Sequence, residues 1–346
     1  MLTAARKYLS WGLLFLTLTG VTLLLLGEAS FSSLVSALDR KTFPWLLAGL
    51  LCMVLFFLCE AQNIRTALNI FGQSVSFSSC LSYSFTGFFF SSITPSSSGG
   101  QPMQLWVMNQ AGHRLAPSGL ALLTVFLSYQ TVSIFLGLAG FLWWRIPLQD
   151  IHPLWWVCFL VGSLLSLSLL AGLLLCLFSP ALAPRLGRAL LPPLQLLMPH
   201  RVPKLTQWAS RQWADLRQCA RQYPYHKKEL GRMVLTAFLQ LTAYHSVPFW
   251  VGLAFGLPLP SLPEVIGLQA ALYLSVSSLP LPGGIGTSEG SALLLYPFLF
   301  PPSLLSGGVL LSRWVSFYLP LLVTGSFLAL RFILSKKKNT SVSCPP

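Results

Sequence analysis

One Gly- and Pro-rich stretch, Ser277 to Glu289, interrupts apolar sequence of membrane length and holds residue types suited to binding an anion. Its glycines, from Gly283 to Gly286, allow tight turns and close backbone approach, and Thr287 or Ser288 could cap a following helix. Unpaired N–H groups and a partial positive charge at a helix N-terminus suit a phosphate or carboxylate headgroup. We therefore predict a half-helix that begins inside the membrane.

A second stretch of the same kind, Ser91 to Gln101, lies in the first half of the chain and is followed by Pro102. Proline is tolerated in the first turn of a helix, so a second half-helix is predicted to begin here. Both stretches contain Ser-Ser, then Ile or Leu, then Pro, then Gly-Gly. Paired breaks in the two halves of a chain point to a transporter-type binding site, because broken backbone at membrane depth must be packed in protein or line a polar cavity. Chance similarity, or glycines that serve only helix packing, would also explain the pattern.

Two ionisable residues lie in segments predicted to be within the membrane. Glu289 begins the predicted half-helix, and Arg313 lies in the last apolar segment. Ionisable groups in hydrocarbon usually face a partner or a wet cavity, so we predict that these two side chains face each other at the site. A purely structural ion pair, or an Arg313 that snorkels to the outer surface, would explain them equally. Gln101 and Gln104 could line the opposite wall.

The candidate substrate-binding residues are therefore drawn from the two breaks, the short helix that follows the first break, and the last apolar segment. They are Thr94, Pro95, Gly99, Gly100, Gln101, Gln104, Gly283, Gly284, Gly286, Glu289 and Arg313. No catalytic residue is predicted.

The composition is that of an integral membrane protein. Of 346 residues, 54% are hydrophobic and 9% charged, where soluble domains have about 25% charged residues. The seven Cys lack CxxC spacing and the five His lack i, i+4 pairing, so we predict neither a disulfide framework, a metal ion nor another cofactor. A Walker-type phosphate loop is also missing from the sequence, which argues against ATP-driven transport by this chain alone.

Apolar segments near the 20 residues needed to span a bilayer predict an all-α membrane protein with about six full transmembrane helices. Two shorter segments, Val75 to Ile93 and Val265 to Leu279, run into the breaks and predict two opposed re-entrant hairpins, a possible inverted repeat. Each is followed by a short apolar helix. The predicted full spans are Leu9 to Leu26, Phe43 to Gln62, Ser118 to Trp144, Pro153 to Phe178, Met233 to Phe255 and Ser306 to Ile333.

Lys and Arg counts predict that both termini are cytoplasmic, together with the basic loop of residues 181–232. Residues 1–335 would form the membrane domain and residues 336–346 a basic tail. The loop holds ten Lys and Arg from Arg185 to Arg232, and its segment from Lys204 to Tyr223 has an apolar stripe opposite a basic one. That pattern is typical of a helix on an anionic inner-leaflet surface, although the positive-inside rule alone would also place these charges. Nucleic-acid binding is not predicted.

At the two breaks the sequence resembles the lysylphosphatidylglycerol synthase transmembrane domain family of flippase-like proteins. The resemblance rests on Thr94-Pro95 through Pro102 and on Pro282 through Gly286 followed by Glu289. It implies a multi-span domain of the bacterial plasma membrane that moves, or helps to move, a lipid between leaflets, with an anionic or aminoacylated phospholipid as partner. Many relatives have Glu and Arg where this chain has Gln101 and Gln104. The chain also leaves no room for the soluble synthase of the fused members, so aminoacyl transfer by this polypeptide is not expected.

Three function classes remain open at this point. The first is a flippase-like transporter whose substrate headgroup sits between the two breaks. The second is a membrane enzyme acting on lipid, such as a component of phosphatidylglycerol lysyltransferase-type modification. Such an enzyme would need a cluster of acid/base or metal-binding residues, and the eight acidic residues do not cluster in sequence. The third is a non-transporting scaffold for a lipid-modifying enzyme, with the basic loop as its docking surface.

Overall fold

The computed structural model describes residues 42–143, 151–178, 219, 222–277 and 282–341. All regular secondary structure in these residues is helical. Four of the described helical segments are long and apolar enough to cross a membrane: Phe43–Ile70, Leu115–Leu142, Pro153–Leu175 and Leu305–Arg331. The predicted span Leu9 to Leu26 and most of the basic loop lie outside the described residues.

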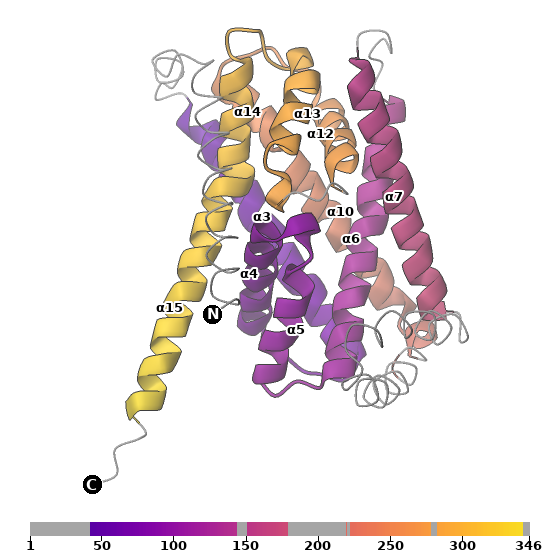
Figure 1. The fold of residues 1–346 in the computed structure, drawn as a ribbon, viewed down its shortest axis with the longest axis vertical. Helices are drawn as coiled ribbons and strands as arrows, with labels where there is room; N and C mark the ends of the chain where they lie inside the picture. Colours follow the sequence, from indigo (N-terminus) through magenta and orange to yellow (C-terminus); the bar gives the residue numbers. More distant parts are fainter. Residues whose placement is uncertain (1–41, 144–150, 179–218, 220–221, 278–281, 342–346) are drawn as a thin grey trace, which may run out of the picture.

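The long helices form the frame of the molecule (Figure 1). They are α3 (Phe43–Ile70), α6 (Leu115–Trp143), α7 (Pro153–Phe178) and a final stack of α14 (Leu305–Arg313), η6 (Trp314–Tyr318) and α15 (Leu319–Ser341). The η6 segment is a π-helical turn. Such turns are rare in helices and frequent at functional sites, and this one directly follows Arg313.

The predicted span Met233 to Phe255 is not one helix. It is divided into α10 (Lys227–His245) and α11 (Val247–Ala254) at Ser246. Pro248 lies in the first turn of α11, a position where a helix does not need the N–H group that proline lacks. In the interior of a longer helix the same proline would remove a backbone hydrogen bond, so α10 ends before it. Short 3₁₀ turns also lie at Tyr223–Tyr225 (η3) and Tyr296–Phe298 (η5).

Each predicted break separates two helices that pack against each other. The first lies between α4 (Phe77–Ile93) and α5 (Gly100–Gln110), with the 3₁₀ turn η1 (Pro95–Ser97) between them. The second lies between α12 (Leu262–Val276) and α13 (Thr287–Leu295), with η4 (Pro282–Gly284) between them. In Figure 1 the α4–α5 pair occupies the lower half of the molecule and the α12–α13 pair the upper half. Because η1 packs against η4, the two breaks meet near the centre.

Glycine contacts place α12 close to the backbone of both α6 and α7. A Cβ atom on Gly140 of α6 would overlap the backbone of Gly267 in α12, and one on Gly162 of α7 would overlap the carbonyl of Leu274 in α12. Without a hydrophobic driving force in lipid, close backbone packing of small residues is a principal source of helix association. The second hairpin is thus fixed against two long helices.

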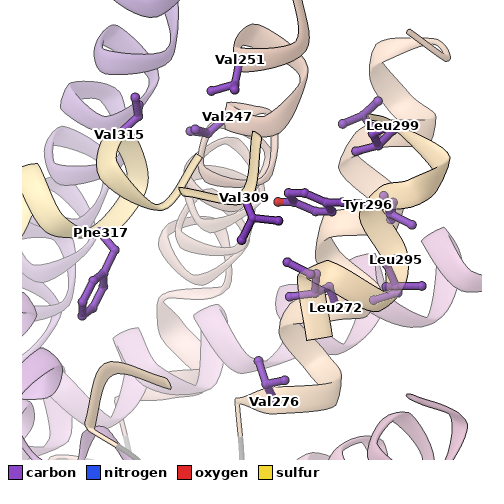
Figure 2. Close-up of a cluster of buried hydrophobic side chains, with 14 of the residues drawn as sticks. Val247, Val251, Leu272, Val276, Leu295, Tyr296, Leu299, Val309, Val315 and Phe317 are labelled. Atoms are coloured by element: carbon purple, nitrogen blue, oxygen red, sulfur yellow. The ribbon is translucent and has the colours of Figure 1, made fainter. Parts of the chain in front are cut away.

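A large apolar cluster packs α11, α12, α13 and the final helix stack together (Figure 2). Val309 is fully buried, and Leu272 and Tyr296 are nearly so. The Tyr296 hydroxyl donates a hydrogen bond to Oε1 of Gln269, 2.7 Å away. This satisfies its polar group within an apolar environment. The cluster holds α13 and Arg313 at fixed positions relative to the second break.

Candidate functional site

The second break depends on glycine at three positions in the left-handed region. Gly283 has φ 58°, Gly284 φ 63° and Gly286 φ 87°, a backbone conformation that costs an L-residue roughly 1–2 kcal/mol. At Gly283 there is also no room for a side chain, because a Cβ atom would overlap the ring of Phe317. The glycines therefore make the turn that brings the N-terminus of α13 into the protein interior.

The side chain of Glu289, and not the hydroxyl of Thr287 or Ser288, accepts the hydrogen bond that caps the N-terminus of α13. The residue at the N-cap is Gly286, and its backbone N–H donates to Oε2 of Glu289 at 2.7 Å. The Thr287 hydroxyl instead donates to the carbonyl of Gly284 at 3.1 Å. A carboxylate in the first turn also complements the helix dipole. The predicted hydroxyl cap was wrong because the left-handed glycines move the start of the helix back by one residue.

The second carboxylate oxygen of Glu289 forms a buried ion pair with Arg313. The Nε–H of Arg313 donates to Oε1 at 2.7 Å, and the Tyr318 hydroxyl donates to the same oxygen at 3.1 Å. Glu289 is 2% exposed and Arg313 8% exposed. The guanidinium also donates through Nη2 to the carbonyl of Gly283 at 3.1 Å and lies 4.3 Å from the centre of the Phe317 ring. The structure thus brings the two predicted residues into direct contact, and this burial within the protein does not fit a snorkelling Arg313.

The first break is held by backbone and hydroxyl hydrogen bonds. Thr94 Oγ1 accepts from the N–H of Gly99 at 2.8 Å and donates to the carbonyl of Phe90 at 2.6 Å. A Cβ atom on Gly99 would lie 2.6 Å from the Thr94 side chain, and one on Gly100 would overlap Ser91. Pro95 begins η1. These contacts shape the turn of the first break.

A cavity of about 660 Å³ lies between the two breaks. Of the candidate residues, Gln101, Gln104, Gly283, Gly284 and Arg313 line it; Thr94, Pro95, Gly99, Gly100, Gly286 and Glu289 are not among the described lining residues. Gln101 is exposed, whereas Gln104 is buried and donates through Nε2 to the carbonyl of Tyr83 at 3.1 Å. The cavity is therefore bounded by both hairpins, with the Arg313 side of the ion pair facing it.

Several lining residues were not predicted from the sequence. Glu60 of α3 lines the cavity, and its Oε2 accepts from Nε2 of Gln240 at 2.8 Å. Tyr129 and Tyr273 also line it and share a hydrogen bond of 3.2 Å between their hydroxyls. Glu60 could have been identified, because it is an acid within an apolar run of membrane length. The tyrosines carry no such signal. Within the described residues, no group of three His, Cys, Asp or Glu side chains could hold a metal ion.

Comparison with known proteins identifies one matching family. The model of the family described as lysylphosphatidylglycerol synthase TM region matches residues 9–324, which include both breaks and the ion pair. No curated protein matches the chain significantly.

Proposed function

The chain belongs to the lysylphosphatidylglycerol synthase transmembrane family, and from this premise we propose that it moves, or helps to move, a lipid between the two leaflets of a bacterial plasma membrane. The headgroup of the lipid would enter the cavity between the two breaks while its acyl chains stay in the bilayer. Membership of this family supports the assignment of the chain as a membrane protein related to lipid modification or flipping.

The observation that best supports this proposal is the cavity bounded by both breaks, whose largely apolar wall carries polar side chains from each hairpin. Its volume of about 660 Å³ falls in the range of 300–1,000 Å³ typical of small-molecule sites, which is large enough for a phospholipid headgroup. Ser97, Ser98 and Gln101 line it from the first hairpin, and Gly283, Gly284 and Ser288 from the second. Irregular backbone at membrane depth is tolerated where it lines such a cavity.

The candidate residues take two roles in this proposal. Gln101, Gln104 and Arg313, with the backbone of Gly283 and Gly284, would contact an anionic or aminoacylated headgroup. The other residues would hold these groups in place: Thr94, Pro95, Gly99 and Gly100 in the first break, and Gly286 and Glu289 in the second. The two hairpins would be re-entrant from opposite sides, an arrangement in which each half-helix N-terminus points to the site.

The proposed arrangement in the membrane follows from charge. Both termini would be cytoplasmic, with residues 1–335 as the transport domain, the basic loop of residues 181–232 on the anionic inner leaflet, and residues 336–346 as a basic tail. A lipid-modifying enzyme could supply the substrate at that surface.

A proteoliposome assay tests the proposed function. Vesicles containing the purified protein and a trace of acyl-chain fluorescent phospholipid are treated with a membrane-impermeant quencher. Without lipid movement about half of the fluorescence is protected in the inner leaflet, so we expect protein-containing vesicles to lose most of that protected fraction. Protection equal to that of protein-free vesicles, for anionic, zwitterionic and aminoacylated lipids alike, would contradict lipid movement by this chain.

A further inference from the structure

The cavity between the breaks extends to α7, a helix at the edge of the molecule. Leu165 and Leu169, one turn apart on α7, are among its described lining residues. The helix itself packs against α6 and α12, and Figure 1 shows it at the right edge of the view, beside α6. The cavity is thus bounded by the two hairpins on one side and by α6 and α7 on the other.

Leu165 and Leu169 lie between the packed and the exposed face of α7. At 3.6 residues per turn they flank the stripe that holds Trp155 and Phe159, which are 2% and 3% exposed. Leu165 is 48% and Leu169 49% exposed, whereas Leu164, on the outer face, is 66% exposed. Because α7 is long and apolar enough to cross a membrane, its outer face would contact acyl chains. The two leucines therefore join the cavity to the surface that faces the bilayer.

The helices α6 and α7 are close at one end and diverge toward the other. Near the connection between them, the rings of Phe141 and Phe159 have their centres 4.8 Å apart. Leu165 and Leu169 lie about 9 and 15 Å beyond Phe159 along α7, at 1.5 Å per residue, and Figure 1 shows the two helices moving apart in that direction. Phe126 lines the cavity from α6. The cavity wall on this side thus consists of two diverging helices, with Phe126 on one and the leucines on the other.

The wall is polar at the breaks and more apolar at α6 and α7. The described lining residues from the two breaks and the half-helices after them are Ser, Gln and Gly: Ser97, Ser98, Gln101, Gln104, Gly283, Gly284 and Ser288. Those from α6 and α7 are mainly apolar: Leu122, Val125, Phe126, Leu165 and Leu169, beside Tyr129, Gln130 and Ser166. Polar groups in a pocket fix the orientation of a ligand, and apolar walls cover its hydrocarbon. This distribution fits a molecule with a polar headgroup and hydrocarbon chains, held with its headgroup at the breaks.

We propose that α6 and α7 form a lateral portal, lined by Phe126, Leu165 and Leu169, through which the acyl chains of the lipid pass from the cavity into the bilayer. This inference rests on the proposed function and adds the path of the chains to it. Chains that follow this path keep an apolar environment while the headgroup is at the breaks. They therefore avoid the free-energy cost of exposing hydrocarbon to water.

Narrowing the lateral portal tests this path. The double variant Leu165→Trp with Leu169→Trp places two large rings at the portal. Leu160→Trp with Leu164→Trp is the matched control, since these leucines have the same spacing on α7, are 62% and 66% exposed, and are not among the described lining residues. In the proteoliposome assay we expect the portal variant to move lipid roughly tenfold more slowly than wild type, as overpacking of the path would predict, and the control to match wild type. Equal rates in the two double variants would overturn the portal.

A fluorescence measurement tests the portal independently of lipid movement. A small fluorophore is attached to Leu169→Cys or to Leu164→Cys in a variant without the natural cysteines, and phosphatidylglycerol with a nitroxide on one acyl chain is added in detergent. At Leu169→Cys, quenching should saturate and be reversed by unlabelled lipid. At Leu164→Cys, it should rise in proportion to the lipid in the micelle.

The two measurements separate the portal from the proposed function. Proportional, unsaturated quenching at both positions would overturn the portal, even for a protein that moves lipid. Saturable quenching at Leu169→Cys alone, without lipid movement in vesicles, would contradict the proposed function and leave the acyl-chain site standing.

Discussion

Replacing Arg313 with Met should destabilise the protein strongly, by roughly 3–5 kcal/mol, because it leaves the carboxylate of Glu289 buried without a counter-charge. Glu289 is 2% exposed, and Arg313 is its ion-pair partner at 2.7 Å. The effect is measured as a drop in melting temperature of the protein purified in detergent. Arg331→Met is the matched control, since Arg331 is exposed on α15, and it should change the melting temperature little.

The double variant Glu289→Gln with Arg313→Met separates structure from function. It removes both charges together, so it should recover much of the stability that Arg313→Met loses. If Arg313 binds the headgroup, the double variant should still fail to move lipid; recovery of both stability and movement would mean that the pair is only structural. An Arg313→Met protein as stable as Arg331→Met would contradict the buried ion pair itself.

Replacing Gly283 with Ala should cost roughly 2–4 kcal/mol, since it combines left-handed strain with overpacking. A Cβ atom at Gly283 would overlap Phe317 and lie 3.0 Å from the carbonyl oxygen of Ser92, which belongs to α4 of the other hairpin. The substitution would therefore force the two breaks apart. We expect a clearly lower melting temperature and loss of lipid movement.

Gly284→Ala is the control for the effect of backbone strain alone. Gly284 has a similar φ of +63°, but the nearest atom to an added Cβ would be 3.8 Å away. The expected cost is therefore the left-handed strain only, roughly 1–2 kcal/mol. Equal melting temperatures for the two alanine variants would contradict the predicted overpacking of an added Cβ atom at Gly283 against Phe317 and Ser92.

Site residues could be predicted from the sequence where a charged side chain falls in apolar, membrane-length sequence, because burying such a charge costs free energy. Glu289 and Arg313 are rare charges in segments of membrane-length apolar sequence, and their contact follows from the cost of burying either one alone. Glu60 gives the same kind of signal, because it is an acid within the apolar run Phe43 to Gln62. Pro248 likewise signalled the division between α10 and α11, although the apolar composition of Met233 to Phe255 suggested one span.

Other features required the three-dimensional arrangement. The cap of α13 depends on the φ values of Gly283 to Gly286, which glycine permits but does not specify. The hydrogen bond between Tyr129 and Tyr273 joins residues 144 positions apart, and no local pattern marks either as part of a cavity. Long-range contacts of this kind come from helix packing, here set by close approaches such as Gly140 with Gly267.

Passage of a lipid headgroup through the cavity between the two breaks can be tested by blocking that cavity. Gln101 is exposed and lines the cavity, while Gln110 is exposed at the opposite end of the same helix, α5, and does not. Each is replaced by Cys in a variant without the natural cysteines, modified with a bulky charged thiol reagent, and assayed in proteoliposomes. We predict that modified Gln101→Cys loses lipid movement while modified Gln110→Cys retains it. Undiminished movement after complete modification of Gln101→Cys would contradict passage of the headgroup through this cavity.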